Sequence, residues 1–277
     1  MKKRVGLFLA LVLILSMAAT GCSKKASPKS AADILKINED EKNNSYSMEG
    51  SVHMEMGMEA MGLTFDIPIT MDMKMDVADK NAHGTMDLTM DMGALGGENT
   101  LSSELYMEKT ENEIVVYSKT NEDSKWSKEG SDSEQMVSMG TSILEGANFD
   151  NADFKHDEEA KTYIVTQKFS DLMASGNMED YFGTLFETFG AMGIDEDSAK
   201  EMMDGMGNTD VVYTFDEEEC HLQSAKIENM EYSLKTETGG MEMTIKATMS
   251  MDFNYSNHGQ IKAEDVAVPD EVKAEAE

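Results

Sequence analysis

Residues 65–77 read FDIPITMDMKMDV, and their alternation is the pattern that decides the fold. Apolar side chains occupy every odd position from Phe65 to Val77, whereas aspartate, threonine, lysine and one proline occupy the even positions. A period of two places the two sets of side chains on opposite faces of a β-strand. The stretch is therefore predicted to be one long strand with an apolar face and a polar face.

The same period recurs along the chain. Residues 46–58, 86–92 and 241–255 alternate in the same way, with methionine at many of the apolar positions. Shorter strands are predicted at 101–107, 113–119, 125–128, 162–169, 211–216 and 226–236, with turn sequences between them. One polar face per strand favours an antiparallel sheet, because parallel sheets are covered on both faces.

Segments with a helical period interrupt the strands. Helices are predicted over residues 31–37, 133–147, 177–190 and 195–206, and Ser30 is the candidate N-cap of the first. The apolar stripes of these helices need a surface to bury them. The apolar face of the sheet is the only predicted surface that is large enough.

Composition excludes several classes of protein. The 277 residues include 23 Lys and Arg against 54 Asp and Glu, which gives a net charge of -31. Such an acidic chain is a poor nucleic-acid binder, because phosphate recognition needs basic residues. The 2 cysteines are too few for a disulfide scaffold or a cysteine-rich zinc module. A hydrophobic content of 40% also excludes an acidic disordered chain.

The N-terminus has the features of an export signal. Lys2, Lys3 and Arg4 precede an apolar run from Val5 to Leu15, which is too short to span a bilayer. The sequence ATGC at residues 19–22 resembles a bacterial lipobox, so Cys22 is predicted to carry the lipid. An ordinary signal peptide with a chance cysteine is the alternative. We expect residues 1–21 to be a lipoprotein signal peptide, 22–30 the lipidated cysteine and a flexible tether, and 31–277 a single domain.

The order of these features resembles a known group of proteins. The features are, in order, the lipobox, the tether, the short helix, the strand opening at 45–50 (SYSMEG), the strand with Trp126 and the closing residues 268–272 (VPDEV). A chain with this order of features is similar to LppX/LprG-type envelope lipoproteins of the LolA/LolB-like fold. Uncharacterised lipoproteins of Gram-positive bacteria are the expected relatives. The resemblance implies an α+β fold: a large curved antiparallel sheet, or half-barrel, of about ten or eleven strands wrapped around a few helices. It also implies an apolar cavity that holds acyl chains.

The methionines have two interpretations. In the first they line this cavity, because methionine is flexible and adapts to varied ligands. The candidate lining residues are Met54, Met56, Met71, Met73, Met75, Met86, Met90, Met92, Phe182, Phe186, Met243, Met249 and Met251. In the second, thioethers such as those of Met54, Met56, Met58 and Met61 bind Cu(I) or Ag(I). Alternation argues against His53 joining such a site, because it places His53 on the face opposite Met54.

Catalytic patterns are missing from the sequence. It has no HExxH, G-x-S-x-G, P-loop or GxGxxG motif, so we expect no enzyme, no cofactor and no metal site. If Cys22 is lipidated, Cys220 is the remaining thiol, and a small buried hydrophobic role is expected for it. Trp126 is interpreted either as an aromatic anchor at the sheet rim or as a residue at the cavity mouth that contacts ligand.

The expected protein is therefore a lipid-anchored lipoprotein on the extracytoplasmic face of the bacterial membrane. It is expected to bind, carry or sense a hydrophobic ligand such as a lipid or acyl chain, without catalysis. A methionine-based copper or silver binder is one alternative, and a structural or signalling envelope protein with no ligand is another. The membrane is the expected partner, through Cys22, and the sequence identifies neither a nucleic-acid nor a protein partner.

Overall fold

The fold is built on a single antiparallel sheet. The computed structural model describes residues 27–39, 45–60, 63–78, 81–91, 93, 97–109, 113–123, 125–132, 149–173, 205–238 and 241–276. The strands are β1 (Tyr46–Ala60), β2 (Leu63–Ala78), β3 (Asn81–Asp91), β4 (Glu98–Lys109), β5 (Glu113–Thr120), β6 (Ser127–Asp132), β7 (Asp153–Asp157), β8 (Thr162–Lys168), β9 (Asp210–Asp216), β10 (Leu222–Thr238) and β11 (Met241–Ser256). The described ranges contain the helices α2 (Ala31–Glu39), α3 (Phe169–Met173) and α6 (Asp270–Glu275).

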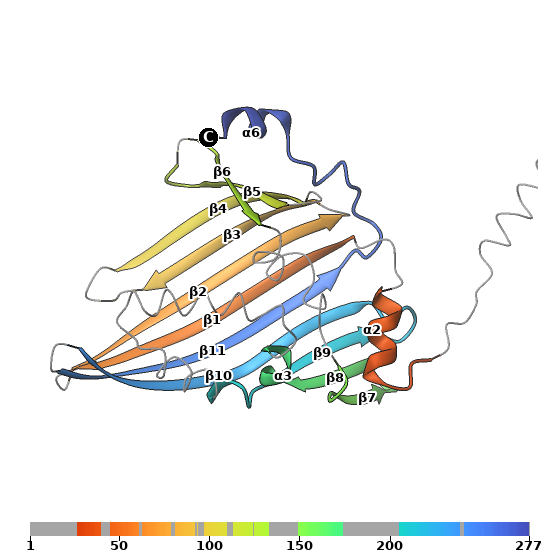
Figure 1. Cartoon of the computed structure of the whole chain (residues 1–277), viewed down its shortest axis with the longest axis horizontal. Coiled ribbons are helices and arrows are strands. Elements are labelled where there is room, and N and C mark those ends of the chain that lie inside the picture. The colour runs from red at the N-terminus through yellow and green to blue at the C-terminus, as the bar shows by residue number, and fades with distance from the viewer. Residues whose placement is uncertain are drawn as a thin grey trace, which may run out of the picture.

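The strand order explains how the chain is laid out. The 11 strands run β6-β5-β4-β3-β2-β1-β11-β10-β9-β8-β7. Successive hairpins lead outward from β1 to β6, and a second series leads inward from β7 to β11 (Figure 1). The first and last strands pair in the middle of the sheet. The sheet is not closed, because β6 and β7 form its two edges.

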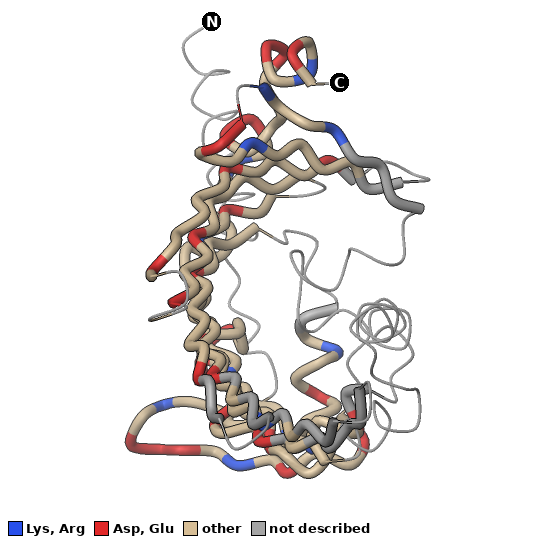
Figure 2. Tube along the Cα trace, turned by 90° about the vertical axis from the view of Figure 1, so that its left-hand side faces the viewer, with Lys and Arg blue, Asp and Glu red and all other residues tan. Residues whose placement is uncertain are grey.

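Viewed nearly edge-on, the sheet is curved (Figure 2). Helix α2 identifies the inner face, since its Ala31 and Ile34 lie in one buried cluster with Val165, Val211 and Tyr213 of β8 and β9. We call this side the inner face and the opposite side the outer face. Helix α2 begins as predicted, because the Ser30 hydroxyl accepts a hydrogen bond from the Asp33 backbone N–H at 3.3 Å.

Most predicted strands are confirmed, and three short elements were missed: β7, α3 and α6. Strand β7 reads DFKHD and has no clear alternation, so its pairing with β8 at the sheet edge left no signal in the sequence. Helix α6 was missed because it has only 6 residues and a single buried side chain, that of Val272. The predicted helices at 133–147 and 177–190, and most of the one at 195–206, lie outside the described residues. The described Met206 is buried in the α2 cluster.

Helix α6 covers part of the outer face. Its Val272 lies in a buried cluster with Val115 and Tyr117 of β5 and with Trp126. Two ion pairs tie the helix to the sheet: Lys273 Nζ lies 2.9 Å from Glu108 Oε2, and Lys119 Nζ lies 3.8 Å from Glu275 Oε1. Strand β5 is thus buried on its outer side as well, which explains why its alternation is weak.

Candidate functional site

The register aligns apolar side chains in rows across the inner face. Residues directly opposite one another in antiparallel strands point to the same face. Met71 of β2 is opposite Val52 of β1 and Leu88 of β3. Followed through every pairing, this row runs Leu101, Leu88, Met71, Val52, Met251, Ile227, Val211 and Gln167.

Parallel rows flank this one and carry more methionines. One row contains Met90, Ile69, Met54, Met249 and Met230, and another contains Met86, Met73, Gly50, Phe253, Ala225 and Tyr213. The methionines of distant strands therefore form one continuous surface. The sequence predicted the face of each methionine but not these cross-strand neighbours.

The structure locates most of the candidate lining residues. On the inner face lie Met54, Met71, Met73, Met75, Met86, Met90, Met249 and Met251. Met56 and Met243 occupy inner register positions, but their side chains lie outside the described part. Cys22, Met92, Phe182 and Phe186 also lie outside the described residues. A ligand-lining role for any of these residues stays a prediction.

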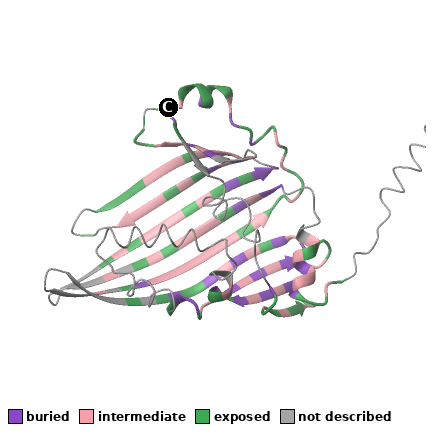
Figure 3. Ribbon diagram, viewed as in Figure 1, coloured by how far each residue is buried: buried purple, intermediate pink, exposed green. Residues whose placement is uncertain are grey.

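Burial is uneven across the inner face (Figure 3). Around α2 the face is tightly packed: Tyr213, Val165 and Met230 are each 0% exposed. A second buried cluster holds Met48, Met75 and Val77. Other side chains on the inner face are only half-buried. Met249 and Met251 pack against the first cluster and Met73 packs against the second, and Met54, Met71, Met86 and Met90 are half-buried as well.

On the six central strands, charges lie on the outer face. At the inner positions of β1, β2, β3, β9, β10 and β11, as the registers define them, none of the residues is charged. Outer positions carry ion pairs such as Lys226 Nζ to Asp252 Oδ2 at 2.7 Å. His53 is exposed on this outer face beside Thr70, which confirms that it points away from Met54.

One uncharged polar group lies among the buried apolar side chains. Gln167 of β8 is 3% exposed, and its Nε2 donates a hydrogen bond to the Tyr213 hydroxyl at 2.9 Å. The Gln167 Oε1 atom is buried, and none of the described residues forms a hydrogen bond with it. Burial raises the pKa of Tyr213, and the hydrogen bond from Gln167 opposes that shift only in part. Burial likewise raises the pKa of Tyr255, with a smaller contribution from Tyr213 nearby.

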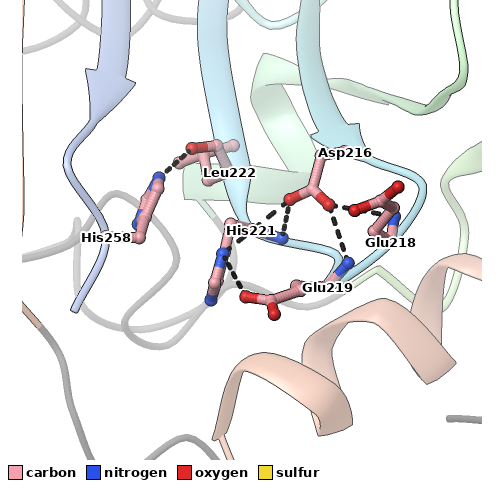
Figure 4. Close-up of polar contacts among 6 residues, drawn as sticks. All are labelled: Asp216, Glu218, Glu219, His221, Leu222 and His258. Atoms are coloured by element: carbon pink, nitrogen blue, oxygen red, sulfur yellow. Dashed lines mark hydrogen bonds and ion pairs between the residues drawn. The ribbon is translucent and has the colours of Figure 1, made fainter. Parts of the chain in front are cut away.

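Asp216, Glu219 and His221 lie in or beside the turn between β9 and β10, and His258, which follows β11, lies next to His221 (Figure 4). Asp216 Oδ1 accepts hydrogen bonds from the backbone N–H groups of Glu218 and Glu219, and Asp216 Oδ2 accepts one from that of His221. The His221 ring stacks on His258 with centroids 4.6 Å apart, and His258 Nε2 lies 2.8 Å from the Leu222 carbonyl oxygen. The carboxylate thus shapes the turn.

This turn holds Cys220 but no metal site. Cys220 has a φ of 61° and is buried, as expected from the sequence. Within the part of the chain that the structure describes, no group of three or more His, Cys, Asp and Glu side chains is arranged to hold a metal ion. No local sequence pattern predicts the histidine pair, because His221 precedes β10 whereas His258 follows β11, far along the chain.

Trp126 packs against outer-face residues. Its ring lies 5.6 Å from that of Tyr106 and belongs to the cluster beneath α6. Tyr106 also stacks on His83 at 4.2 Å, on the same face. This position favours the aromatic-anchor interpretation, since the half-buried methionines lie on the opposite face.

Comparisons with known proteins identify a family. Residues 31–277 match a family described as "Family of unknown function (DUF6612)". No curated protein matches the chain. Among solved structures, a DUF1329 family protein from Desulfovibrio piger matches at 10% identity and a TM-score of 0.24, over 85% of this chain and 97% of that one. Of the helices in the described ranges, none has the length and apolar character needed to cross a bilayer.

Proposed function

The chain belongs to the DUF6612 family, and we propose that it is a lipid-anchored extracytoplasmic protein that binds, carries or senses a hydrophobic ligand without catalysis. The site is the half-buried methionine surface of the inner face, which we define as Met54, Met71, Met73, Met86, Met90, Met249 and Met251. The observation that carries the proposal is this uncharged, incompletely buried apolar surface.

Physical chemistry favours a ligand on such a surface. Apolar side chains that keep contact with water lose the stabilisation of burial, about 25 cal/mol for each Å². A bound acyl chain would recover it. Thioether side chains have three rotatable bonds and a polarizable sulfur, so the surface would adjust to ligands of different shape. Cys22 and its tether would hold the domain at the membrane, where such ligands are found.

The first test is binding to the full chain carrying Cys22→Ser, which keeps the lipid anchor itself out of the measurement. Native mass spectrometry of the purified protein is expected to show co-purified lipid, and hexadecane is expected to displace the fluorophore N-phenylnaphthylamine. If no lipid co-purifies and hexadecane displaces no fluorophore, the proposal is overturned and a structural or signalling role is favoured.

A matched pair of substitutions locates the site. Met71→Gln places an amide against the ligand and is expected to weaken hexadecane binding about tenfold, since an unpaired polar group costs about 1–3 kcal/mol. Thr70→Gln changes the neighbouring residue, which points to the outer face, and is expected to leave the affinity unchanged. Equal effects of the two substitutions would place the ligand elsewhere.

One observation favours a second candidate function. Met54, Met249 and Met230 are directly opposite one another on three neighbouring strands, which is an arrangement that thioether ligands of a soft metal ion would use. Titration with Ag⁺, followed by native mass spectrometry, tests it in the wild type and in a variant with Met54, Met56 and Met58 replaced by leucine. Unchanged stoichiometry and affinity would discard those sites.

A further inference from the structure

The buried amide of Gln167 identifies the chemistry of the ligand. We propose that Gln167 is the head-group site for an uncharged amphiphile, one whose hydroxyl group hydrogen-bonds to the amide while its hydrocarbon chain lies on the methionine surface. This inference rests on the proposed function and adds the ligand's polar group to it.

Gln167 has a buried atom that lacks a partner. The residue is only 3% exposed, and its Oε1 has no hydrogen-bond partner among the described residues. A buried acceptor without a partner is costly, so native proteins rarely retain one without a water molecule or ligand to satisfy it. Exchanging the amide's oxygen and nitrogen would pair Oε1 with the Tyr213 hydroxyl and leave Nε2 with the missing partner instead. A hydroxyl group satisfies either arrangement, because it both donates and accepts.

The position of Gln167 connects it to the methionine surface. Gln167 ends the same inner row that contains Val211, Ile227, Met251 and Met71. Five strand spacings separate Gln167 on β8 from Met71 on β2, about 24 Å along the row at the usual spacing. That span is comparable with an extended sixteen-carbon chain. Val211 and Ile227 are buried in the α2 cluster, so a hydrocarbon chain along this row would have to displace the side chains that pack on them.

The central strands offer no charge at their inner positions that would compensate for a charged head group. The inner positions of β1–β3 and β9–β11 carry neither a cation nor an anion. The Tyr213 hydroxyl, which Gln167 contacts, and the hydroxyl of Tyr255, which lies near Tyr213, are neutral at physiological pH, since the ordinary pKa of tyrosine is near 10 and burial raises it further in both. A carboxylate or phosphate in this place would be desolvated without a partner, which strongly disfavours it. The ligand's head group is therefore uncharged.

The experiment compares hexadecanol, hexadecane and palmitate by displacement of N-phenylnaphthylamine from the full chain carrying Cys22→Ser. The measured quantity is the ratio of the hexadecanol and hexadecane affinities, because solubility differences cancel when the ratio is compared between variants. In Gln167→Met this ratio is expected to fall about three- to tenfold, the value of one hydrogen bond. Palmitate is expected to bind more weakly than hexadecanol.

Two further variants keep the result interpretable. Gln167→Met combined with Tyr213→Phe removes both partners of the existing hydrogen bond, so the double variant is expected to fold normally and to show the same fall. Gln223→Met makes the same change at an exposed position and is expected to keep the wild-type ratio.

Each contrary result has a defined meaning. An unchanged ratio in both Gln167 variants, with hexadecane still bound, would overturn the inference and leave a buried water as the partner of Gln167. Palmitate binding as tightly as hexadecanol would overturn the uncharged head group. Failure of all three compounds to bind the wild type would overturn the proposed function itself.

Discussion

At the scale of single residues, Gly84 shows how closely two strands approach. It lies on the inner face of β3 opposite Met75, and a Cβ atom there would overlap the backbone carbonyl oxygen of Lys74. Gly84→Ala is expected to lower the free energy of unfolding by about 1–3 kcal/mol in urea titrations, because backbone cannot move aside as a side chain does. Gly205→Ala is the control, since nothing lies within 4 Å of its Cβ position. Equal effects would contradict the steric argument.

Asp216 and Asp157 provide a comparison of two turns. Asp216 uses both carboxylate oxygens to accept backbone N–H groups, including that of His221, whereas Asp157 uses only Oδ1. Asp216→Asn turns one acceptor into a donor facing an N–H group, and we expect a loss of about 1–2 kcal/mol in unfolding free energy. Asp157→Asn keeps its single acceptor and is expected to cost less. The reverse order, measured by urea unfolding, would show that the turn does not depend on the second oxygen.

At the scale of elements, α6 has a built-in reporter. Trp126 is the single tryptophan of the sequence, and it is buried in the cluster that contains Val272 of α6. Val272→Ser is expected to loosen the helix, which would shift Trp126 fluorescence to longer wavelength and increase its quenching by acrylamide. Ala274→Ser changes an exposed residue of the same helix and is expected to have no effect. Unchanged emission in Val272→Ser would mean that α6 does not shield Trp126.

The docking of α6 is also expected to depend on pH. The hydrogen bond to Glu108 raises the pKa of Lys273, so this contact stabilises the folded state below the unfolded pKa of lysine and is lost as pH rises through the raised value. The two side chains are 39% and 33% exposed, so the effect is a fraction of a kcal/mol. Hydrogen exchange of residues 270–276 is expected to be slower in the wild type than in Glu108→Gln near pH 8, and equal at a higher pH that exceeds the raised pKa of Lys273. A difference that persists at the higher pH would contradict this assignment.

Strong local patterns were readable from the sequence, whereas contacts between distant segments were not. Strands β1, β2 and β11 alternate over many residues, so their existence and faces were predicted. The register that places Met54 beside Met249 depends on the pairing of the first and last strands, which no local pattern encodes. Gln167 did leave a signal: it is a polar residue at a position where the alternation of Tyr163, Val165 and Phe169 calls for an apolar one.

At the scale of the whole molecule, the net charge of -31 should affect folding more than ligand binding. Excess carboxylates repel one another, and salt screens that repulsion over about 10 Å at 0.1 M. Raising NaCl from about 10 mM to about 200 mM is expected to raise the melting temperature measured by circular dichroism. Hexadecane affinity is expected to stay constant, because the inner positions of β1–β3 and β9–β11 are uncharged. A salt-dependent affinity would place charge in the binding site.

The pairing of β1 with β11 has a consequence for the order of folding. Strand β1 is made first and acquires its second neighbour only when residues 241–256 of β11 have been made. Until then β1 has an open hydrogen-bonding edge beside an apolar, methionine-rich face, which is the kind of surface that aggregates. Synthesis of this chain thus exposes a long, vulnerable intermediate, and a premature stop before β11 would leave it without the strand that seals that edge.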